Sequence, residues 1–340
     1  MDTSASPLSI DQLYSLAPRK LPFRRNLRYA GDGMGVNLAD FSSSDQALIQ
    51  RLYILIGEIL VVLREHRDYP ASTLLRLKEF CRETSWRNFA TEIRQLGEEL
   101  SSVAETQRLR QVVHDLRGGG FLALSIYLQM LELGMTQPLD FQRMFFLARD
   151  QLKIMRNGVQ GLDDLGDERD SSFNLHNVDL LVEKWADSAH RLQGRVAQIS
   201  VESHFVGAIA ERCLEFSALD RVIYNLMNNA ALNSADEHVY MAILPLEISE
   251  YESLRFVIVN KVSASQQATL EQRWDAGLGQ LFQGGFTTGG SGLGMRICAD
   301  FVCNAYGLDS VDQGLTEGHF GATILAAHFA VWFHWPIAAE

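Results

Sequence analysis

The sequence predicts a multidomain protein, in which an all-helical N-terminal region and a helical hairpin precede an α/β sandwich. Apolar residues recur at helical spacing from about residue 44 to residue 162. From residue 173 onwards, short strand patterns are interspersed with helical ones, which favours helices packed on a mixed sheet. The acidic residues 163–172 lie between these patterns, and we interpret them as a linker. We therefore divide the chain into residues 1–100, 101–168 and 169–340.

Length, charge and cysteine content restrict the class of protein. A chain of 340 residues can form two or three domains. Its net charge of −12 repels nucleic acid and anionic lipid, so we expect no nucleic-acid partner. The four cysteines lack zinc-ligand spacing and are expected to be reduced thiols. No apolar run reaches the roughly 18 residues of a membrane helix, and the N-terminus lacks a signal pattern. We expect a cytoplasmic protein without a membrane span.

The first hundred residues are expected to be irregular at first and helical afterwards. Residues 1–40 are rich in Ser, Pro, Gly and Arg and show little periodicity. We interpret the local basic patch in this segment as a solvated tail, with a binding site as the alternative. Three apolar stripes then predict three helices, of which the run Leu52 to Leu63 fits a buried helix. This region is a candidate for signal input or partner binding. The basic patch comprises Arg19, Lys20, Arg24, Arg25 and Arg28.

Two longer apolar patterns predict a hairpin of helices. The first ends near Gly134, and Thr136-Gln137-Pro138 forms a turn. The second alternates spacings of four and three, which is typical of a coiled-coil or bundle seam. Because a hairpin alone buries little surface, we expect a homodimer that forms a four-helix bundle. The seam residues are Leu109, Val113, Leu116, Leu124, Leu128, Leu131, Phe141, Phe145, Ala148, Leu152, Met155, Val159 and Leu162.

His114 lies beside the seam residue Val113, so we expect its ring to reach solvent. A neutral imidazole is a competent nucleophile, Asp115 could orient it or take its proton, and Arg117 could stabilise phosphate charge. The alternative is an ordinary surface histidine. The three glycines at 118–120 each cost about 1 kcal/mol in a helix interior. They should loosen or bend the helix, or let a partner approach closely.

The C-terminal half carries two polar motifs. Asn225 and Asn229 project from one face of a helix predicted to begin near Ser217, and a carboxamide oxygen suits Mg²⁺. Six glycines lie between Gly284 and Gly294, where glycine lets backbone approach a ligand and a following helix directs its N–H groups at phosphate. The alternatives are a solvated asparagine face and a flexible loop.

The remaining elements of this half follow from short patterns. We predict one further helix, Val178 to Leu192. The predicted strands are Phe173 to Leu175, Val196 to Val201, Val239 to Leu244, Leu254 to Val259 and Thr323 to Val331.

The motifs Asn-Leu-x-x-Asn-Ala, Phe-Thr-Thr and Gly-x-Gly-Leu-Gly together resemble the ATP-binding domain of sensor histidine kinases, which belongs to the GHKL group of ATPases. The resemblance covers about residues 170–336. It implies that Asn225 and Asn229 form the asparagine box, with Asn229 as the magnesium ligand. It also implies that ATP contacts the phenylalanine box and the second glycine box, which comprise Phe286, Thr287, Thr288, Gly290, Gly292, Leu293 and Gly294. His114, Asp115, Leu116 and Arg117 resemble the phospho-acceptor box.

The chain departs from the family at the first glycine box. Asn260 to Ala264 stand where relatives usually have Asp-x-Gly-x-Gly. Asn260 could accept a hydrogen bond from the adenine amino group, but without charge assistance. Leu232 and Asn233 also replace common basic and aromatic residues, so we expect weakened ATP binding. Gly118 stands where bifunctional relatives often have Thr or Asn, which puts phosphatase activity in doubt.

The resemblance implies a cytoplasmic histidine kinase of a two-component system. ATP and Mg²⁺ would support autophosphorylation on His114, and the phosphoryl group would pass to an aspartate of a response regulator receiver domain. An upstream sensor protein is a further candidate partner. The alternative is a histidine phosphotransferase or pseudokinase adaptor with weak or no ATP binding. An ATPase that acts as a conformational machine ranks last, because it leaves the His114 box unexplained.

Overall fold

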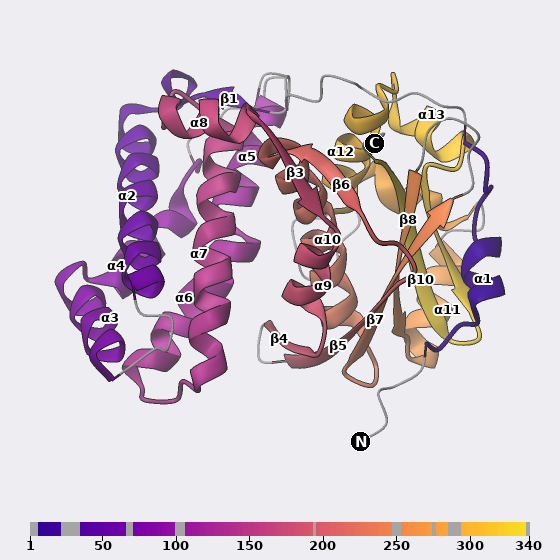
Figure 1. The fold of residues 1–340 in the computed structure, drawn as a ribbon, viewed down its shortest axis with the longest axis horizontal. Helices are drawn as coiled ribbons and strands as arrows, with labels where there is room; N and C mark the ends of the chain where they lie inside the picture. The colour runs from indigo at the N-terminus through magenta and orange to yellow at the C-terminus, as the bar shows by residue number, and fades with distance from the viewer. Residues whose placement is uncertain are drawn as a thin grey trace. The chain divides into compact units, whose positions relative to one another are not determined.

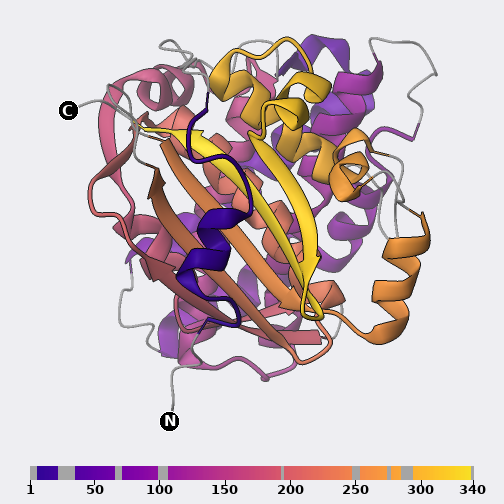
Figure 2. The ribbon, with the colours of Figure 1, turned by 90° about the vertical axis from the view of Figure 1, so that its right-hand side faces the viewer.

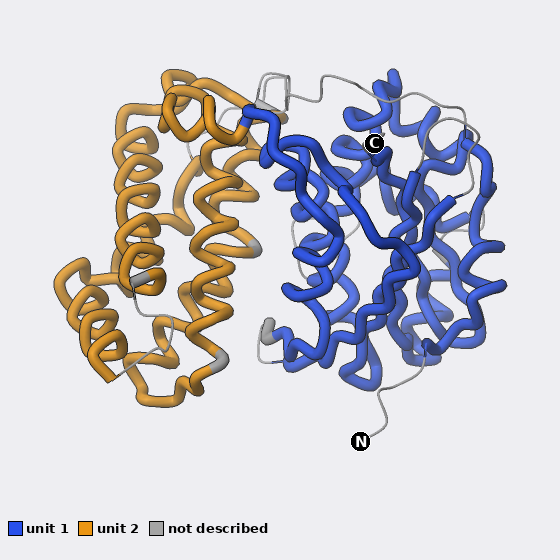
Figure 3. The backbone as a smooth tube through the Cα atoms, in the orientation of Figure 1, with its two compact units in different colours: residues 1–30, 171–340 blue, residues 31–170 orange. Residues whose placement is uncertain are grey.

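The chain folds into two compact units in a computed structural model (Figures 1 and 3). One unit spans Gly31–Asp170, and the other combines Ser171–Glu340 with Met1–Ala30. The first is built mainly of helices and the second of sheet and helix, which confirms the predicted mixture of helix and sheet. The structure describes residues 6–21, 35–65, 71–98, 106–192, 195–246, 253–273, 277–284 and 294–337.

Helices lie along most of the predicted apolar stripes in the helical unit, but the second hairpin helix, predicted through Leu162, ends at Gly158, where a short strand begins. Short segments β1 (Val36–Asn37) and β2 (Val159–Gln160) pair in parallel, with the 3-10 turn η1 (Leu38–Asp40) after β1. The helices are α2 (Ser43–Glu65), α3 (Ala71–Glu83), α4 (Trp86–Gln95), α5 (Thr106–Arg117), α6 (Gly119–Glu132), α7 (Pro138–Gly158) and α8 (Asp164–Ser171).

The apolar seam of α5, α6 and α7 is covered by helices of the same chain. Leu116, Leu124, Leu128 and Met155 are all 0 % exposed, and they share one core with buried residues of α2, α3 and α4. Helix α2 packs along α7. The apolar cover that we expected from a second copy is therefore supplied within one chain by α2 and its neighbours.

Helix α2 departs from the expectation that no segment is long and apolar enough to cross a membrane. Residues Ser43–Arg64 are long and apolar enough by length and composition. Their 18-residue apolar window has a mean hydropathy of 1.7, and 33 % of that window is buried. The predicted stripe does face the core. The buried members of that stripe are Ile49, Leu52, Ile56, Ile59 and Leu63.

The predicted linker at 163–172 is mostly helical, because residues Asp164–Ser171 form helix α8, and the boundary between the two units follows Asp170. Asp170 pairs with Arg156 of α7 at 2.7 Å, and both side chains are less than 10 % exposed. Gly166 permits this approach, since a Cβ there would lie 2.4 Å from the Arg156 Cδ. The acidic composition thus serves a buried ion pair as well as solvation.

The second unit contains a six-stranded sheet in the order β4-β5-β7-β8-β10-β9. Among the strands that the structure describes in this sheet, β5 and β7 pair in parallel and all other neighbours are antiparallel. The strands are β4 (Ser188–Leu192), β5 (Arg195–Ser203), β7 (His238–Leu246), β8 (Ser253–Lys261), β9 (Phe320–Leu325) and β10 (His328–Pro336), while β3 (Phe173–Asn177) pairs separately with β6 (Ala208–Arg212).

Helices cover both faces of this sheet (Figure 2). Helices α10 and α12 pack on one face, and the short α1 lies on the other. The helical segments are α1 (Ile10–Ser15), α9 (Asp179–Trp185), α10 (Cys213–Asn233), α11 (Ala264–Arg273), η2 (Leu278–Gln283), α12 (Gly294–Tyr306) and α13 (Val311–Thr316).

Three predicted boundaries in this unit are wrong. The helix predicted at 178–192 ends at Trp185, and β4 follows after Asp187 adopts a φ of 52°. The strand predicted at 323–331 is a hairpin, because Ala326 and Ala327 turn the chain with φ values of 47° and 64°. Helix α10 begins at Cys213 rather than near Ser217, and the Glu215 carboxylate accepts the Glu211 N–H at 2.9 Å just before it.

The N-terminal segment is more ordered than its composition suggested. Leu8 and Leu13 pack in one apolar cluster with β7, β8 and β10. Arg255 of β8, which is 0 % exposed, donates four hydrogen bonds of 2.7 to 3.1 Å to this segment. Its acceptors are the carbonyls of Leu13, Tyr14, Ala17 and Pro18. Arg19 lies over the Tyr14 ring, whereas Arg24, Arg25 and Arg28 lie outside the described residues.

Candidate functional site

His114 lies in the last turn of α5 with its side chain 27 % exposed. Its Nδ1 lies 3.4 Å from Oδ1 of Asp115, whose side chain is 9 % exposed. A hydrogen bond to Nδ1 favours the tautomer that leaves a lone pair on Nε2. In that tautomer Nε2 is the nucleophilic nitrogen of a partly exposed imidazole.

The predicted continuous helix around His114 is broken at Gly118. Helix α5 ends at Arg117, and α6 begins at Gly119 after Gly118 takes φ −91° and ψ −159°. The Gly118 N–H donates to the His114 carbonyl at 2.8 Å. A Cβ on Gly118 would lie 2.6 Å from that oxygen, so the break requires glycine. The glycines, which we expected to loosen or bend the helix, thus interrupt it completely.

Arg117 contacts the end of α4. Its Nη1 donates to the carbonyls of Arg94 and Leu96 at 3.0 Å each. These carbonyls form the negative end of α4, where a cation is stabilising. The structure therefore engages Nη1 of this guanidinium on another helix, so a role for Arg117 at a phosphoryl group would fall to its Nη2 and Nε donors.

The second candidate site lies between α10 and α12. A Cβ on Gly294, the first residue of α12, would lie 3.7 Å from the Asn229 Nδ2. The structure thus brings the asparagine box and the last glycine of the second glycine box together. Asn229 also holds the helix end, because its carbonyl accepts from Asn233 Nδ2 at 2.8 Å.

Asn225 faces the interior of the α10–α12 contact. A side-chain hydrogen bond joins it to the thiol of Cys298, and burial raises the pKa of that thiol despite this bond. The Cys298 Sγ also donates to the Val222 carbonyl at 3.6 Å. The Asn225 amide therefore takes part in packing, which leaves Asn229 as the candidate ligand for Mg²⁺.

Regular structure occupies the position of the first glycine box. Strand β8 continues through Asn260, which is 3 % exposed and donates from Nδ2 to the Lys261 carbonyl at 3.2 Å. Val262 N–H donates to the Ala327 carbonyl at 2.9 Å, and Ser263 Oγ accepts the Gln266 N–H at 3.2 Å as α11 begins. A strand end and a helix cap thus replace the glycine loop. Most of the phenylalanine box and the second glycine box lies outside the described residues, namely Phe286, Thr287, Thr288, Gly290, Gly292 and Leu293.

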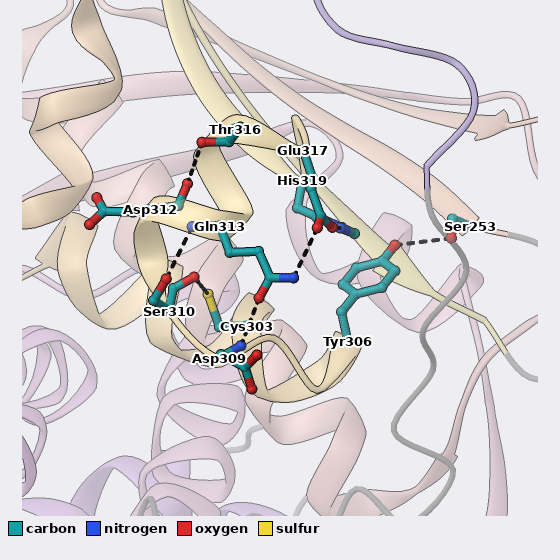
Figure 4. Close-up of polar contacts among 10 residues, drawn as sticks. All are labelled: Ser253, Cys303, Tyr306, Asp309, Ser310, Asp312, Gln313, Thr316, Glu317 and His319. Carbon is teal, nitrogen blue, oxygen red and sulfur yellow. Dashed lines mark hydrogen bonds and ion pairs between the residues drawn. The ribbon is translucent and has the colours of Figure 1, made fainter.

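A polar network fixes the far end of α12 (Figure 4). Tyr306 donates to Ser253 Oγ at 2.9 Å, and Gln313 donates from its N–H to Ser310 Oγ and from Nε2 to Glu317. Tyr306 lies about 18 Å along the helix from Gly294. This network therefore anchors α12 without belonging to the candidate nucleotide site.

Further contacts of α10 come from side chains that the sequence analysis did not identify. Lys184 Nζ lies 2.6 Å from the Asp220 carboxylate, and His190 Nε2 lies 2.7 Å from Asn228 Oδ1. Asp220 precedes the asparagine box in sequence, but its partner on α9 has no periodic signature. These contacts hold the helix that presents Asn229.

No protein-family model and no curated protein matches the chain. Among solved structures, the chain is similar to the catalytic domain of the histidine kinase ThkA, with 16 % identity, coverage of 49 % of this chain and 96 % of that one, and a TM-score of 0.31. The Acinetobacter baumannii histidine kinase AdeS matches with 12 % identity, coverage of 66 % and 98 %, and a TM-score of 0.30. The histidine kinase domain of the Erythrobacter litoralis blue-light activated kinase EL346 matches with 14 % identity, coverage of 74 % and 94 %, and a TM-score of 0.29.

The residues of this chain carry the resemblance: the His114–Asp115 pair and the asparagine helix that meets Gly294. In these motifs the chain resembles the sensor histidine kinases with a GHKL-type ATPase domain.

Proposed function

We propose that the chain is a cytoplasmic protein-histidine kinase that transfers the γ-phosphoryl group of ATP to His114 and then to an aspartate of a response regulator. The observation that supports this most is the proximity of Asn229 to Gly294, because it brings a side-chain carboxamide to the start of a helix that follows a glycine-rich segment. A partly exposed histidine paired with Asp115 supplies the acceptor.

At the acceptor, the Nε2 lone pair of His114 attacks the γ-phosphorus, the bond to the β–γ bridging oxygen breaks, and ADP leaves. Asp115 holds the Nδ1 proton and stabilises the positive charge that develops on the ring. In the second transfer, a carboxylate oxygen of the receiver domain attacks the phosphorus, the P–N bond breaks, and the imidazole is restored. Most of the catalysis in such transfers comes from positioning and charge neutralisation.

The residues around Asn229 fit a magnesium nucleotide in part. The Asn229 carboxamide oxygen would hold Mg²⁺, which when bound neutralises phosphate charge. Asn260 is buried on β8 and would meet the adenine amino group with a neutral acceptor. Because a strand end and a helix cap occupy the first glycine box, we expect weak nucleotide affinity.

Incubation with Mg²⁺ and ATP radiolabelled on the γ-phosphate tests the kinase directly. We expect acid-labile label on the wild type and none on His114→Ala. Asp115→Asn should label more slowly, because the neutral amide stabilises the ring charge less. Label that persists on His114→Ala would refute the assignment of the acceptor.

The replacement of the first glycine box favours a second candidate, a histidine phosphotransferase that receives its phosphoryl group from another protein. Calorimetric titration with a non-hydrolysable ATP analogue and Mg²⁺ separates the two. Absence of binding heat at millimolar analogue, together with His114-dependent transfer from a phosphorylated receiver domain, would establish the phosphotransferase. Binding together with His114-dependent labelling by ATP would establish the kinase.

A further inference from the structure

We propose that Gln151 is a positioning residue for His114, which keeps α5 and α6 separate and so holds the acceptor in the last turn of a short helix. The inference rests on the proposed function only in taking His114 as the phospho-acceptor. It assigns a role to a side chain on α7 that belongs to none of the family motifs.

The Gln151 amide contacts the backbone that the break exposes. Its Nε2 lies 3.4 Å from the carbonyl oxygens of both Asp115 and Leu116. In a continuous helix these two carbonyls would accept from the N–H groups of Gly119 and Gly120, four residues later. One side-chain amide therefore replaces two helical hydrogen bonds at the interruption.

Gly120 provides the space for this amide. A Cβ on Gly120 would lie 2.8 Å from the Gln151 Oε1, so a larger residue would push the side chain away. Gly118 meets the other requirement of the break, since a Cβ there would clash with the His114 carbonyl. Two of the three consecutive glycines are therefore explained by the interrupted helix and by the entry of Gln151.

The burial of Gln151 is costly for stability alone. The side chain is 0 % exposed, and its Oε1 has no hydrogen-bond partner among the described residues. A buried acceptor without a partner loses its hydration without compensation, so an apolar side chain of similar size would suit a simple core position better. The amide is useful here because it can donate hydrogen bonds to the carbonyls of Asp115 and Leu116 at the helix break.

The alternative is a continuous α5–α6 helix, in which the two helical hydrogen bonds form and the Gln151 amide is displaced. In the interrupted form, the His114 carbonyl accepts from Gly118, and the ring Cε1 lies 3.9 Å from the Cβ position of that glycine. The extended Gly118 makes the chain leave the helix one turn after His114. Joining the helices would extend the chain along α5 past the imidazole and change the approach to Nε2.

The test uses phosphoramidate, which phosphorylates histidine without the nucleotide site: the imidazole nitrogen attacks phosphorus, the P–N bond of the reagent breaks, and ammonia leaves. Gln151→Met keeps the length of the side chain and removes the amide. We expect its rate of His114 phosphorylation, followed by ³¹P NMR on the full chain, to change by about two- to tenfold, the population change that one ordinary hydrogen bond produces. The His114→Ala variant shows whether the phosphoryl group is on the assigned residue, since it should give no phosphohistidine signal.

Gly119→Pro is the matched rescue. Proline lacks an N–H, suits the first position of a helix and requires an extended residue before it, which Gly118 already is. It therefore enforces the break without Gln151, and the double variant Gln151→Met with Gly119→Pro should react at the wild-type rate. A residue that merely fills space would not be rescued in this way.

Hydrogen exchange supplies a second measurement on Gln151→Met alone. The amides of Gly119 and Gly120 should become more protected, because they gain acceptors when the helices join. Wild-type reactivity of Gln151→Met, unchanged protection of these amides, or a rate change that a folded double variant does not reverse would each overturn the proposal. If His114→Ala is still phosphorylated by phosphoramidate, the assignment of His114 as the phospho-acceptor fails instead.

Discussion

Gly294→Ala should weaken nucleotide binding without weakening the fold. The new methyl group would lie 3.7 Å from the Asn229 Nδ2, an ordinary van der Waals separation, so the nucleotide-free chain can accommodate it. Alanine is favoured over glycine in a helix by up to about 1 kcal/mol, and Gly294 is the first residue of α12. The free energy of unfolding should therefore stay the same or rise slightly.

The same methyl group enters the space beside the proposed magnesium ligand. Displacing a phosphate oxygen or a bound water there should cost at least the roughly 1.4 kcal/mol of a tenfold loss in affinity. Calorimetric titration with an ATP analogue and Mg²⁺ measures this loss, and thermal unfolding measures stability.

Gly57→Ala is the matched control. Gly57 lies within α2 and, apart from its own helix backbone, has no atom of the described residues within 4 Å of its Cβ position, so the variant gains helix propensity in the other unit without a new contact. It should bind nucleotide like the wild type. If Gly294→Ala also binds like the wild type, the phosphates do not lie between Asn229 and α12, and the proposed site is wrong.

Three further predictions concern stability. Burial raises the pKa of Asp167 to about 6 from 3.8, against the lowering effect of Arg156, so the folded chain binds this proton more tightly than the unfolded chain. Ionising Asp167 therefore destabilises the fold: this cost is absent below about pH 4, grows as the pH rises to about 6 and is complete at pH 7. Asp167→Asn should raise the free energy of unfolding by about 1–2 kcal/mol at pH 7, after allowance for solvent screening, and should leave it unchanged at pH 4. Urea titrations at the two pH values measure this difference. Leu128→Ala should cost about 2–5 kcal/mol in a transition independent of protein concentration, because α2 and its neighbours bury this side chain within one chain; a concentration-dependent midpoint would instead indicate a dimeric seam. Arg255→Met should release α1, so trypsin should cut after Arg19 faster than in the wild type, and equal cleavage rates would mean that the four hydrogen bonds do not hold the segment.

Periodic elements were predictable from the sequence because their burial repeats along the chain. The stripe of α2, the helix that bears Asn229 and the paired strands β7 and β8 all followed from spacing. The turn at Ala326 and Ala327 was not predictable, since neither residue is typical of positive φ and both lie within an apolar run. Composition did not reveal the helix and the buried ion pair at 163–172, because the partner of Asp170 is supplied by α7.

The motifs of the candidate site could be identified from the sequence, but the contacts that fix them could not. His114 and Asp115 are adjacent in the chain, and Asn229 is part of a recognisable spacing. Arg117 bonds to carbonyls more than twenty residues earlier, and Arg255 bonds to carbonyls more than two hundred residues earlier. Gln151 is one of several amide residues of α7, and nothing in its spacing distinguishes it from Gln142 or Asn157.

The central claim is that His114 receives the γ-phosphoryl group of ATP. Peptide mapping by mass spectrometry, after incubation of the full chain with Mg²⁺ and ATP and digestion at neutral to alkaline pH, tests it most directly. We predict one phosphorylated peptide, which contains His114 and loses its phosphoryl group in acid. A phosphoryl group found on another residue, or an unmodified chain that nevertheless binds nucleotide, would contradict the claim.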